Sequence, residues 1–394
     1  MILQESPRVH LSYCLNIHPG ETLEENLGAI EEHALRVKQR VSPDHPFGLG
    51  LRFGHKAVEE IEDATAIRSR FDDWGVYAFT VNGFPYGAFH QTRVKENVYL
   101  PDWQTEERTL YTKQLTDVMA QLVPSGTAGS ISTLPLTFKD WPKTDEDMRR
   151  ITRNLIDCVI HMNRIEEEEG IEIHLGLEPE PCCGLETTTE FIDYFNNYVL
   201  AHGLDHLEAQ SGFNRNRCED IVRRHLGINL DTCHLAIQYE DLAESIGRLT
   251  GEGIRLSKVH ISAALAALNE PEHLEALAAF DEPVYLHQVK GRTEAGEIHS
   301  WTDLPAALRD LPNQPDVRDL RIHFHVPLFW EGSDLLGSTS ADLTDAFFGQ
   351  LKQGVCEHLE IETYTFDVLP DDLRADDIVD SISGELEWAL QRLR

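Results

Sequence analysis

Short runs with the character of β-strands alternate with helix-like stretches along the whole chain. This alternation is typical of a parallel sheet whose strands are connected by covering helices. The predicted strands cover residues 9–17, 47–53, 75–81, 129–135, 171–178, 227–233, 254–261, 320–326 and 357–364, with a weaker, peripheral run at 283–289. A barrel of eight strands has one place fewer than the nine main runs. One of them is therefore expected to be miscalled or to lie outside the barrel.

Within the predicted strands, apolar and polar residues alternate. In residues 171–178 every odd position is Ile or Leu, and the even positions are Glu172, His174, Gly176 and Glu178. Such strands fit a barrel whose outer face packs on helices and whose interior is hydrophilic. An antiparallel sheet with one wet face produces the same alternation, but it would need hairpins where this chain has long helical connections. The sequence therefore predicts an α/β fold, a (β/α)8 TIM barrel with loop insertions.

The clearest predicted helix covers residues 144–169. Thr144 is its expected N-cap, three acidic residues follow in the first turn, and Gly170 is expected to end it. No repeat or Pro/Gly/Ser-rich linker divides the sequence. Because single barrels reach this length when their loops carry insertions, residues 1–394 are predicted to form a single TIM-barrel domain.

The charge balance is strongly acidic. The chain has 34 Lys and Arg against 68 Asp and Glu, which gives a net charge of -34. A field of this sign opposes nucleic acids and anionic membranes. The sequence contains no apolar run of 18 residues, and its N-terminus lacks the regions of a signal peptide, so we expect no membrane insertion and a cytoplasmic protein. The seven cysteines show no CxxC spacing, which argues against a disulfide framework or a thiolate zinc site.

Several predicted strands end in residues of metal-ligand type. These are Glu178, Asp231, His260 and Glu362, with His234 three residues beyond Asp231. Catalytic groups of α/β barrels gather at the C-terminal ends of the strands, so residues from four strands can converge on one point. Carboxylates with imidazole suit Mn²⁺, Zn²⁺, Fe²⁺ or Co²⁺, and the ligand set does not exclude Mg²⁺.

Other residues are candidates for enlarging this site. A second ion or a substrate would find further ligands in His234, His287, His323 and His325. Glu180 and Glu360, the nearest competitors of Glu178 and Glu362 in the sequence, are expected to point elsewhere. The loop 81–90 is unusually aromatic, and it predicts either a pocket wall or a loop that packs on its own barrel. The candidate residues of this substrate pocket are Phe84, Tyr86, Phe89 and Lys95.

At these residues the sequence resembles the xylose-isomerase-like barrel superfamily, which contains sugar isomerases, epimerases and apurinic endonucleases. GINLDTCHLA and LSKVHIS are similar to two metal-binding strands of the endonuclease branch, and HQVKGRTEAGEIHSWTDL is similar to its downstream segment. Ahead of His287, however, Tyr285 stands where that branch would have Asp. Over nearly the whole chain, blocks such as TVNGFPYGAFH, LGLEPEPCC, HFHVPLF and HLEIETYTFDVLP resemble the metabolite traffic protein EboE family.

The resemblance implies a divalent metal held by Glu178, Asp231, His260 and Glu362. In the epimerases of the superfamily, carboxylates at the positions of Glu178 and Glu362 also exchange a proton next to a carbonyl. The EboE likeness implies a role in exporting a secondary-metabolite precursor, without establishing a reaction.

Three functions follow from the residues and the resemblance. The first is a metal-dependent isomerase or epimerase with Glu178 and Glu362 as catalytic residues, acting on a small polyhydroxylated or carbonyl metabolite. The second is a metal-containing carrier of such a metabolite. The third, a metal-dependent nuclease, conflicts with the charge of -34. The expected partner is a small molecule, and assembly into a homo-oligomer is left open.

Overall fold

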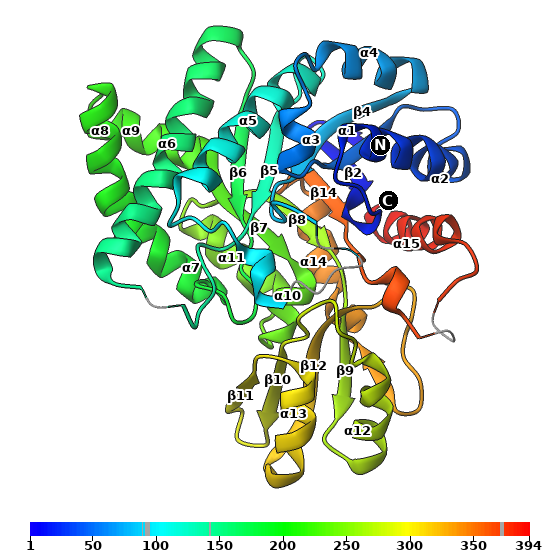
Figure 1. Ribbon diagram of the computed structural model, residues 1–394. Helices are drawn as coiled ribbons and strands as arrows, with labels where there is room; N and C mark the ends of the chain where they lie inside the picture. The colour runs from blue at the N-terminus through cyan, green and yellow to red at the C-terminus, as the bar shows by residue number, and fades with distance from the viewer. Residues whose placement is uncertain (89, 91–94, 142, 371–373) are drawn as a thin grey trace.

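Eight parallel strands form the centre of the molecule (Figure 1). The computed structural model describes residues 1–88, 90, 95–141, 143–370 and 374–394. From β2 the sheet runs through β14, β8, β7, β6, β5 and β4 to β3, and a parallel bridge between Cys14 and Gly50 closes the ring. A short strand, β1 (Ile2–Glu5), pairs antiparallel with β2. The barrel strands are β2 (Arg8–Tyr13), β3 (Phe47–Arg52), β4 (Val76–Asn82), β5 (Gly129–Thr133), β6 (Ile173–Leu177), β7 (Leu226–Asp231), β8 (Arg255–Ile261) and β14 (His358–Ile361).

Helices cover the outside of this barrel, which confirms the predicted TIM-barrel fold (Figure 1). π-helical turns at Ile30–Ala34 and Phe195–Gly203 join α1 to α2 and α7 to α8. Every helix among the described residues is too short or too polar to cross a membrane. The helices around the barrel are α1 (Leu23–Ala29), α2 (Leu35–Val41), α3 (His55–Glu59), α4 (Thr65–Trp74), α5 (Glu106–Leu122), α6 (Asp145–Glu169), α7 (Thr188–Tyr194), α8 (Leu204–Ser211), α9 (Arg215–His225), α10 (Thr232–Ile237), α11 (Leu242–Gly251), α14 (Asp345–Lys352) and α15 (Ile378–Leu393).

The predicted helix 144–169 is confirmed as α6. Thr144 accepts a hydrogen bond from the Asp147 backbone N–H, and the Asp147 side chain accepts one from the Thr144 backbone N–H. This reciprocal cap satisfies two backbone donors at the start of the helix. Gly170 ends it in the left-handed conformation, with φ of 72°. The local sequence therefore determines both ends of this helix.

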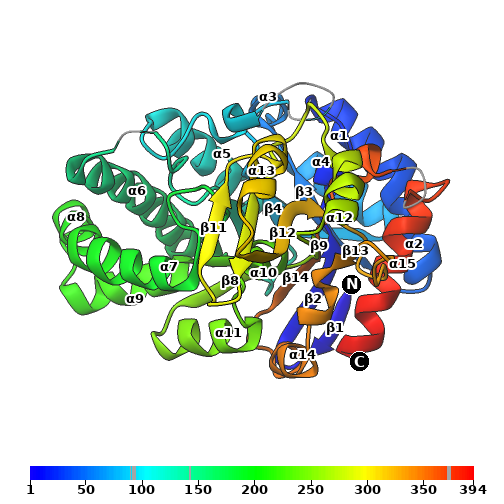
Figure 2. The same cartoon turned by 90° about the horizontal axis from the view of Figure 1, so that it is seen from below.

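A second sheet of five antiparallel strands is inserted between β8 and β14. It lies below the barrel in Figure 1 and in front of it in Figure 2, and its apolar residues belong to the same hydrophobic core. Because the two sheets share this core, we propose that the chain is a single domain. The strand order is β11, β10, β12, β9, β13. The inserted elements are β9 (Ala264–Leu268), α12 (Pro271–Leu277), β10 (Val289–Thr293), β11 (Ile298–Trp301), α13 (Leu304–Asp310), β12 (Val317–His325) and β13 (Leu336–Ser338).

The inserted sheet identifies the surplus run among the nine predicted strands. Residues 320–326 fall in and just after β12, so their assignment to the barrel is wrong. An antiparallel strand with one buried apolar face and one polar face has the same period as a barrel strand, so the alternation does not distinguish them. The weak run 283–289 is a loop that enters β10 only at Val289.

The barrel interior is hydrophilic, as the alternation predicts. Lys258 of β8 is fully buried, and its Nζ lies 2.8 Å from Glu360 Oε2 and 3.1 Å from Ser132 Oγ. Gly50 of β3 makes room for this pair, because a Cβ at that position would lie 1.5 Å from Glu360 Oε1. The interior ion pair therefore depends on a glycine that local β-propensity disfavours.

A buried carboxyl on α15 leads to a prediction about pH. Glu385 Oε1 accepts hydrogen bonds from Leu328 N–H (3.1 Å) and the Thr363 hydroxyl (2.7 Å), and burial raises the pKa of Glu385 to about 7. Above its unfolded pKa near 4.5, the unfolded chain releases the proton while the folded chain keeps it. The contribution of Glu385 to stability is therefore full in acid and falls by about 3 kcal/mol as the pH rises to 7.

Glu385→Gln keeps the acceptor oxygen and cannot titrate. Denaturant unfolding at pH 5 and pH 8 should therefore show the variant gaining stability relative to the parent as the pH rises. Comparing the two proteins at each pH cancels the titration of all other groups. A stability difference that is the same at both pH values would contradict the assignment.

Candidate metal centre

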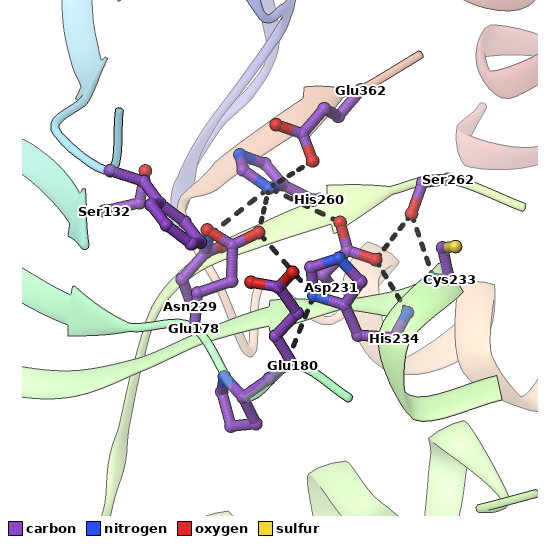
Figure 3. Close-up of polar contacts among 12 residues, drawn as sticks. Ser132, Glu178, Glu180, Asn229, Asp231, Cys233, His234, His260, Ser262 and Glu362 are labelled. Atoms are coloured by element: carbon purple, nitrogen blue, oxygen red, sulfur yellow. Dashed lines mark hydrogen bonds and ion pairs between the residues drawn. The ribbon is translucent and has the colours of Figure 1, made fainter. Parts of the chain in front are cut away.

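The four side chains of the predicted metal site meet at the C-terminal mouth of the barrel (Figure 3). Glu178 follows β6, Asp231 ends β7, His260 lies in β8 and Glu362 follows β14. His260 Nδ1 lies 3.0 Å from Glu178 Oε1, 3.6 Å from Asp231 Oδ2 and 3.2 Å from Glu362 Oε2. Ligand atoms of all four lie within 4.8 Å of one another. The structure therefore brings together residues that are far apart in the sequence.

The donor set of this group fits a divalent cation. All four residues are buried, and three carboxylates face a single imidazole. Glu178 Oε2 and Asp231 Oδ2 have no hydrogen-bond partner among the described residues. Burying carboxylate oxygens without donors is costly, and a cation would compensate for that cost. Oxygen ligands with one imidazole suit the divalent metals expected from the sequence, and they do not select one of them.

The pKa values of Asp231, Glu362 and His260 are shifted by burial and by their charged neighbours. Burial alone would raise the pKa of Asp231, but the neighbouring histidines, His234 first among them, hold it well below its usual range. Burial raises the pKa of Glu362, and the Glu178 carboxylate acts in the same direction. For His260 burial acts to lower the pKa, but Glu362 and Glu178 outweigh it and raise the pKa well above its ordinary value.

A second layer of contacts orients His260. Its Nε2 lies 2.8 Å from Glu360 Oε2, and Lys258 pairs with the same oxygen. Because Glu360 accepts from Nε2–H, Nδ1 is the ring nitrogen that faces the three carboxylates. Glu360 lies outside the metal-ligand group, as expected, but it contacts the ligand His260 from the other side of the ring. Lys258 and Glu360 occupy inward positions of their strands, as His260 does, and strand alternation is the signal that could have indicated their role.

Polar side chains also hold the carboxylates. Asn16 and Asn82 donate through Nδ2 to Glu362 Oε1 at 2.7 and 3.3 Å. The Ser262 hydroxyl donates to Asp231 Oδ1 at 2.8 Å. These contacts leave Glu362 Oε2 and Asp231 Oδ2 directed at His260. Sequence reasoning missed Asn16, Asn82 and Ser262, because Asn and Ser near strand ends are usually ordinary loop residues.

A pocket opens onto the metal-ligand group and encloses about 590 Å³ of space, its mouth included. Glu178 and Glu362 lie at its polar end together with Glu180, whose pKa is raised by burial to about 7. The expectation that Glu180 points elsewhere is therefore wrong. Largely apolar or aromatic side chains supply much of the remaining wall, namely Phe84, Pro85, Val98, Tyr285, Leu286 and Tyr364.

Only some of the predicted pocket residues line the pocket. Phe84 and Lys95 line the pocket, and Lys95 Nζ also lies 2.8 Å from Asp303 Oδ2. Tyr86 is not among the lining residues, because its ring stacks on His55 with centroids 4.5 Å apart. Phe89 lies outside the described residues. The aromatic loop is thus partly pocket wall and partly ordinary packing.

Three of the four additional histidines lie close to the metal-ligand group, and the fourth does not. His234 and His323 line the pocket, and His325 belongs with Asp231 and His234 to a group whose ligand atoms lie within 4.8 Å of one another. His287 does not join them. Its Nδ1 lies 2.9 Å from the His323 backbone oxygen and its Nε2 lies 2.8 Å from Glu282 Oε1. Both of its ring nitrogens are therefore used in structural contacts.

Comparisons with known proteins establish the fold. No protein-family model and no curated protein matches this chain. A xylose isomerase-like TIM barrel protein from Mycobacterium smegmatis, solved in complex with magnesium, has 11% identity and a TM-score of 0.52, covering 98% of this chain and 96% of its own. The IolI protein, solved with a bound zinc atom, has 15% identity and a TM-score of 0.49, covering 98% of each chain. The fold is therefore that of the xylose-isomerase-like TIM barrels.

Proposed function

We propose that this chain is a divalent-metal-dependent isomerase or epimerase that acts on a small polyhydroxylated or carbonyl metabolite. The observation that carries the proposal is the group of Glu178, Asp231, His260 and Glu362 at the polar end of a pocket. The magnesium complex of the M. smegmatis protein supports it, because that protein has the same fold. The aromatic and apolar side chains that line the pocket also favour a small-molecule ligand.

Bound by these four residues, the metal would polarise the substrate carbonyl and hold neighbouring oxygens. Glu178 or Glu362 then accepts the proton from the carbon next to the carbonyl, and the electrons of the broken C–H bond shift towards the carbonyl oxygen. Isomerisation follows when the proton returns to the former carbonyl carbon while the proton of the adjacent hydroxyl moves to the former carbonyl oxygen. Epimerisation follows when a proton returns to the opposite face of the carbon that lost it. Phe84 and Tyr364 line the wall of the pocket in which this transfer would take place.

The test is a screen of aldoses, ketoses and cyclic polyols in D₂O, with protein loaded with Mn²⁺, Mg²⁺, Zn²⁺ or Co²⁺. Proton NMR should show deuterium entering the position next to the carbonyl of one substrate class. His260→Ala, which removes a ligand, should abolish the exchange and serves as the control. Tight binding of a compound without exchange or turnover would reject the enzyme.

A metabolite carrier is the second candidate function. The apolar walls of the pocket favour it, since they bind a small molecule without contributing acid–base groups. The likeness to the EboE blocks supports placing either activity in the export of a secondary-metabolite precursor. A cytoplasmic location and a homo-oligomer are parts of this proposal, and light scattering coupled to gel filtration tests the second.

Binding to DNA is expected to be negligible at physiological salt. The net charge of -34 repels phosphates, and only a local basic patch would overcome that repulsion. Fluorescence anisotropy with a duplex carrying an abasic site should show no binding at micromolar protein. Salt-sensitive binding at that concentration or below would instead favour a nuclease.

A further inference from the structure

Three buried imidazoles lie next to the metal-ligand group. His234 comes from α10, whereas His323 and His325 come from strand β12 of the inserted sheet. Their exposed fractions are 3%, 3% and 0%. Each pair of them offers ligand atoms within 4.8 Å, and Asp231 and Glu180 each share such a group with two of the three. This cluster, His234, His323 and His325, is called the imidazole cluster below.

The hydrogen bonds of the imidazole cluster determine which ring nitrogens carry protons. His234 Nδ1 lies 3.0 Å from the backbone oxygen of Pro179, and His325 Nδ1 lies 2.7 Å from that of Glu362. A carbonyl oxygen can only accept, so each of these Nδ1 atoms carries a hydrogen. In a neutral ring, Nε2 then presents its lone pair.

His323 follows the same pattern through a side-chain amide. Its Nδ1 lies 2.6 Å from Gln288 Oε1. The orientation of this amide follows from its other end, because Gln288 Nε2 donates to the Pro181 backbone oxygen at 3.1 Å. His323 Nδ1 is therefore also a donor, and all three Nε2 atoms are left as acceptors.

As long as all three rings are neutral, these Nε2 atoms have no adequate donors. His234 Nε2 and His323 Nε2 face each other at 3.0 Å, and two lone pairs at that distance repel unless a proton or a cation lies between them. The Tyr364 hydroxyl lies 3.5 Å from His323 Nε2, at the limit of a hydrogen bond. His325 Nε2 is buried without any hydrogen-bond partner among the described residues. Histidines whose Nδ1–H is held by a carbonyl while Nε2 stays free are typical metal ligands.

We propose that the imidazole cluster binds a second divalent ion, with His234 as the ligand common to the two arrangements that the structure offers, His323 with Glu180 or His325 with Asp231. Imidazole favours Zn²⁺, Co²⁺, Fe²⁺ and related ions, whereas Mg²⁺ prefers oxygen ligands. The second site therefore excludes Mg²⁺, although the carboxylate-rich first site accepts it. This inference goes beyond the proposed reaction and does not depend on it.

The experiment measures bound metal by mass spectrometry after equilibrium dialysis against Zn²⁺ alone or Mg²⁺ alone. The parent protein should retain one more Zn²⁺ than Mg²⁺ per chain. His323→Ala/His325→Ala should lose one Zn²⁺ and keep its Mg²⁺. His260→Ala should lose the Mg²⁺ and keep one Zn²⁺. His299→Ala, in strand β11 of the same inserted sheet, removes a histidine outside the cluster and should match the parent.

The outcomes separate the two metal sites. A double variant that retains all the Zn²⁺ of the parent would overturn the second site. A His260→Ala variant that loses its Mg²⁺ but keeps one Zn²⁺ supports the second site, and one that loses all of its Zn²⁺ would overturn it. Titration of the unaltered protein with Co²⁺ covers the case in which the double variant fails to fold. A visible absorption band that saturates only at two equivalents supports the proposal, and saturation at one equivalent overturns it.

Discussion

Glu362→Gln is expected to lower turnover by about 10²–10⁴-fold, the usual contribution of a general acid or base, while much of the metal stays bound. The amide keeps the shape of the side chain and one oxygen ligand, but it no longer accepts a proton. Glu178→Gln should behave in the same way if the two carboxylates share the transfer. Both variants are measured by deuterium exchange and by metal content.

The variants of the other two ligands should differ from these. Asp231→Ala and His260→Ala each remove a ligand without replacing it, so we expect the metal content of the first site to fall together with the activity. Glu385→Gln makes the same chemical change at a buried carboxyl outside the metal-ligand group and is the matched control. If both Gln variants at Glu178 and Glu362 retain full exchange activity, neither carboxylate is the base.

The second large effect is expected at Lys258. Lys258→Met keeps most of the volume but removes the charge that faces Glu360 at 2.8 Å inside the barrel. Both side chains are fully buried, so the variant leaves a buried carboxylate with His260 as its remaining charged partner. Breaking a buried pair in this way costs about 3–5 kcal/mol of stability. Denaturant unfolding monitored by circular dichroism measures the loss.

Lys139→Met is the matched control for this prediction. The Lys139 side chain is 48% exposed, and its partner Glu186 keeps a second ion pair with Lys290 at 2.9 Å. Because Lys139 is half exposed and the buried Glu186 carboxylate keeps another cation, we expect a smaller loss here than at the fully buried pair. If both variants lost the same amount of stability, the buried pair would contribute no more to folding than the half-exposed pair, and the prediction would be wrong.

A substitution at Lys258 should also affect the first metal site. Glu360 is the common partner of Lys258 and of His260 Nε2, so loss of the lysine changes what holds the His260 ring in place. The Glu360 carboxylate therefore links the buried Lys258 of the barrel interior to the metal ligand His260. The inserted sheet contributes from the other side, because β12 places His323 in the pocket wall.

Local sequence determined those features whose cause is local. The ends of α6 follow from the cap at Thr144 and from Gly170, which takes the left-handed conformation. The four predicted ligands lie at strand ends, and parallel strands in a barrel bring their C-terminal ends together on one side. Their convergence was therefore predictable from strand alternation before any distance was known.

Only the tertiary structure decided the features that depend on which strands are neighbours. The run 320–326 has the alternation of a barrel strand, yet hydrogen bonding places β12 between β9 and β10 of the inserted sheet. Glu360 and Glu180 lie close to predicted ligands in sequence, but their roles depend on partners from other elements, such as Lys258 and Tyr99. Alternation indicates which side of a strand a residue occupies. The side chains that meet it there come from distant parts of the chain, and only packing in three dimensions brings them together.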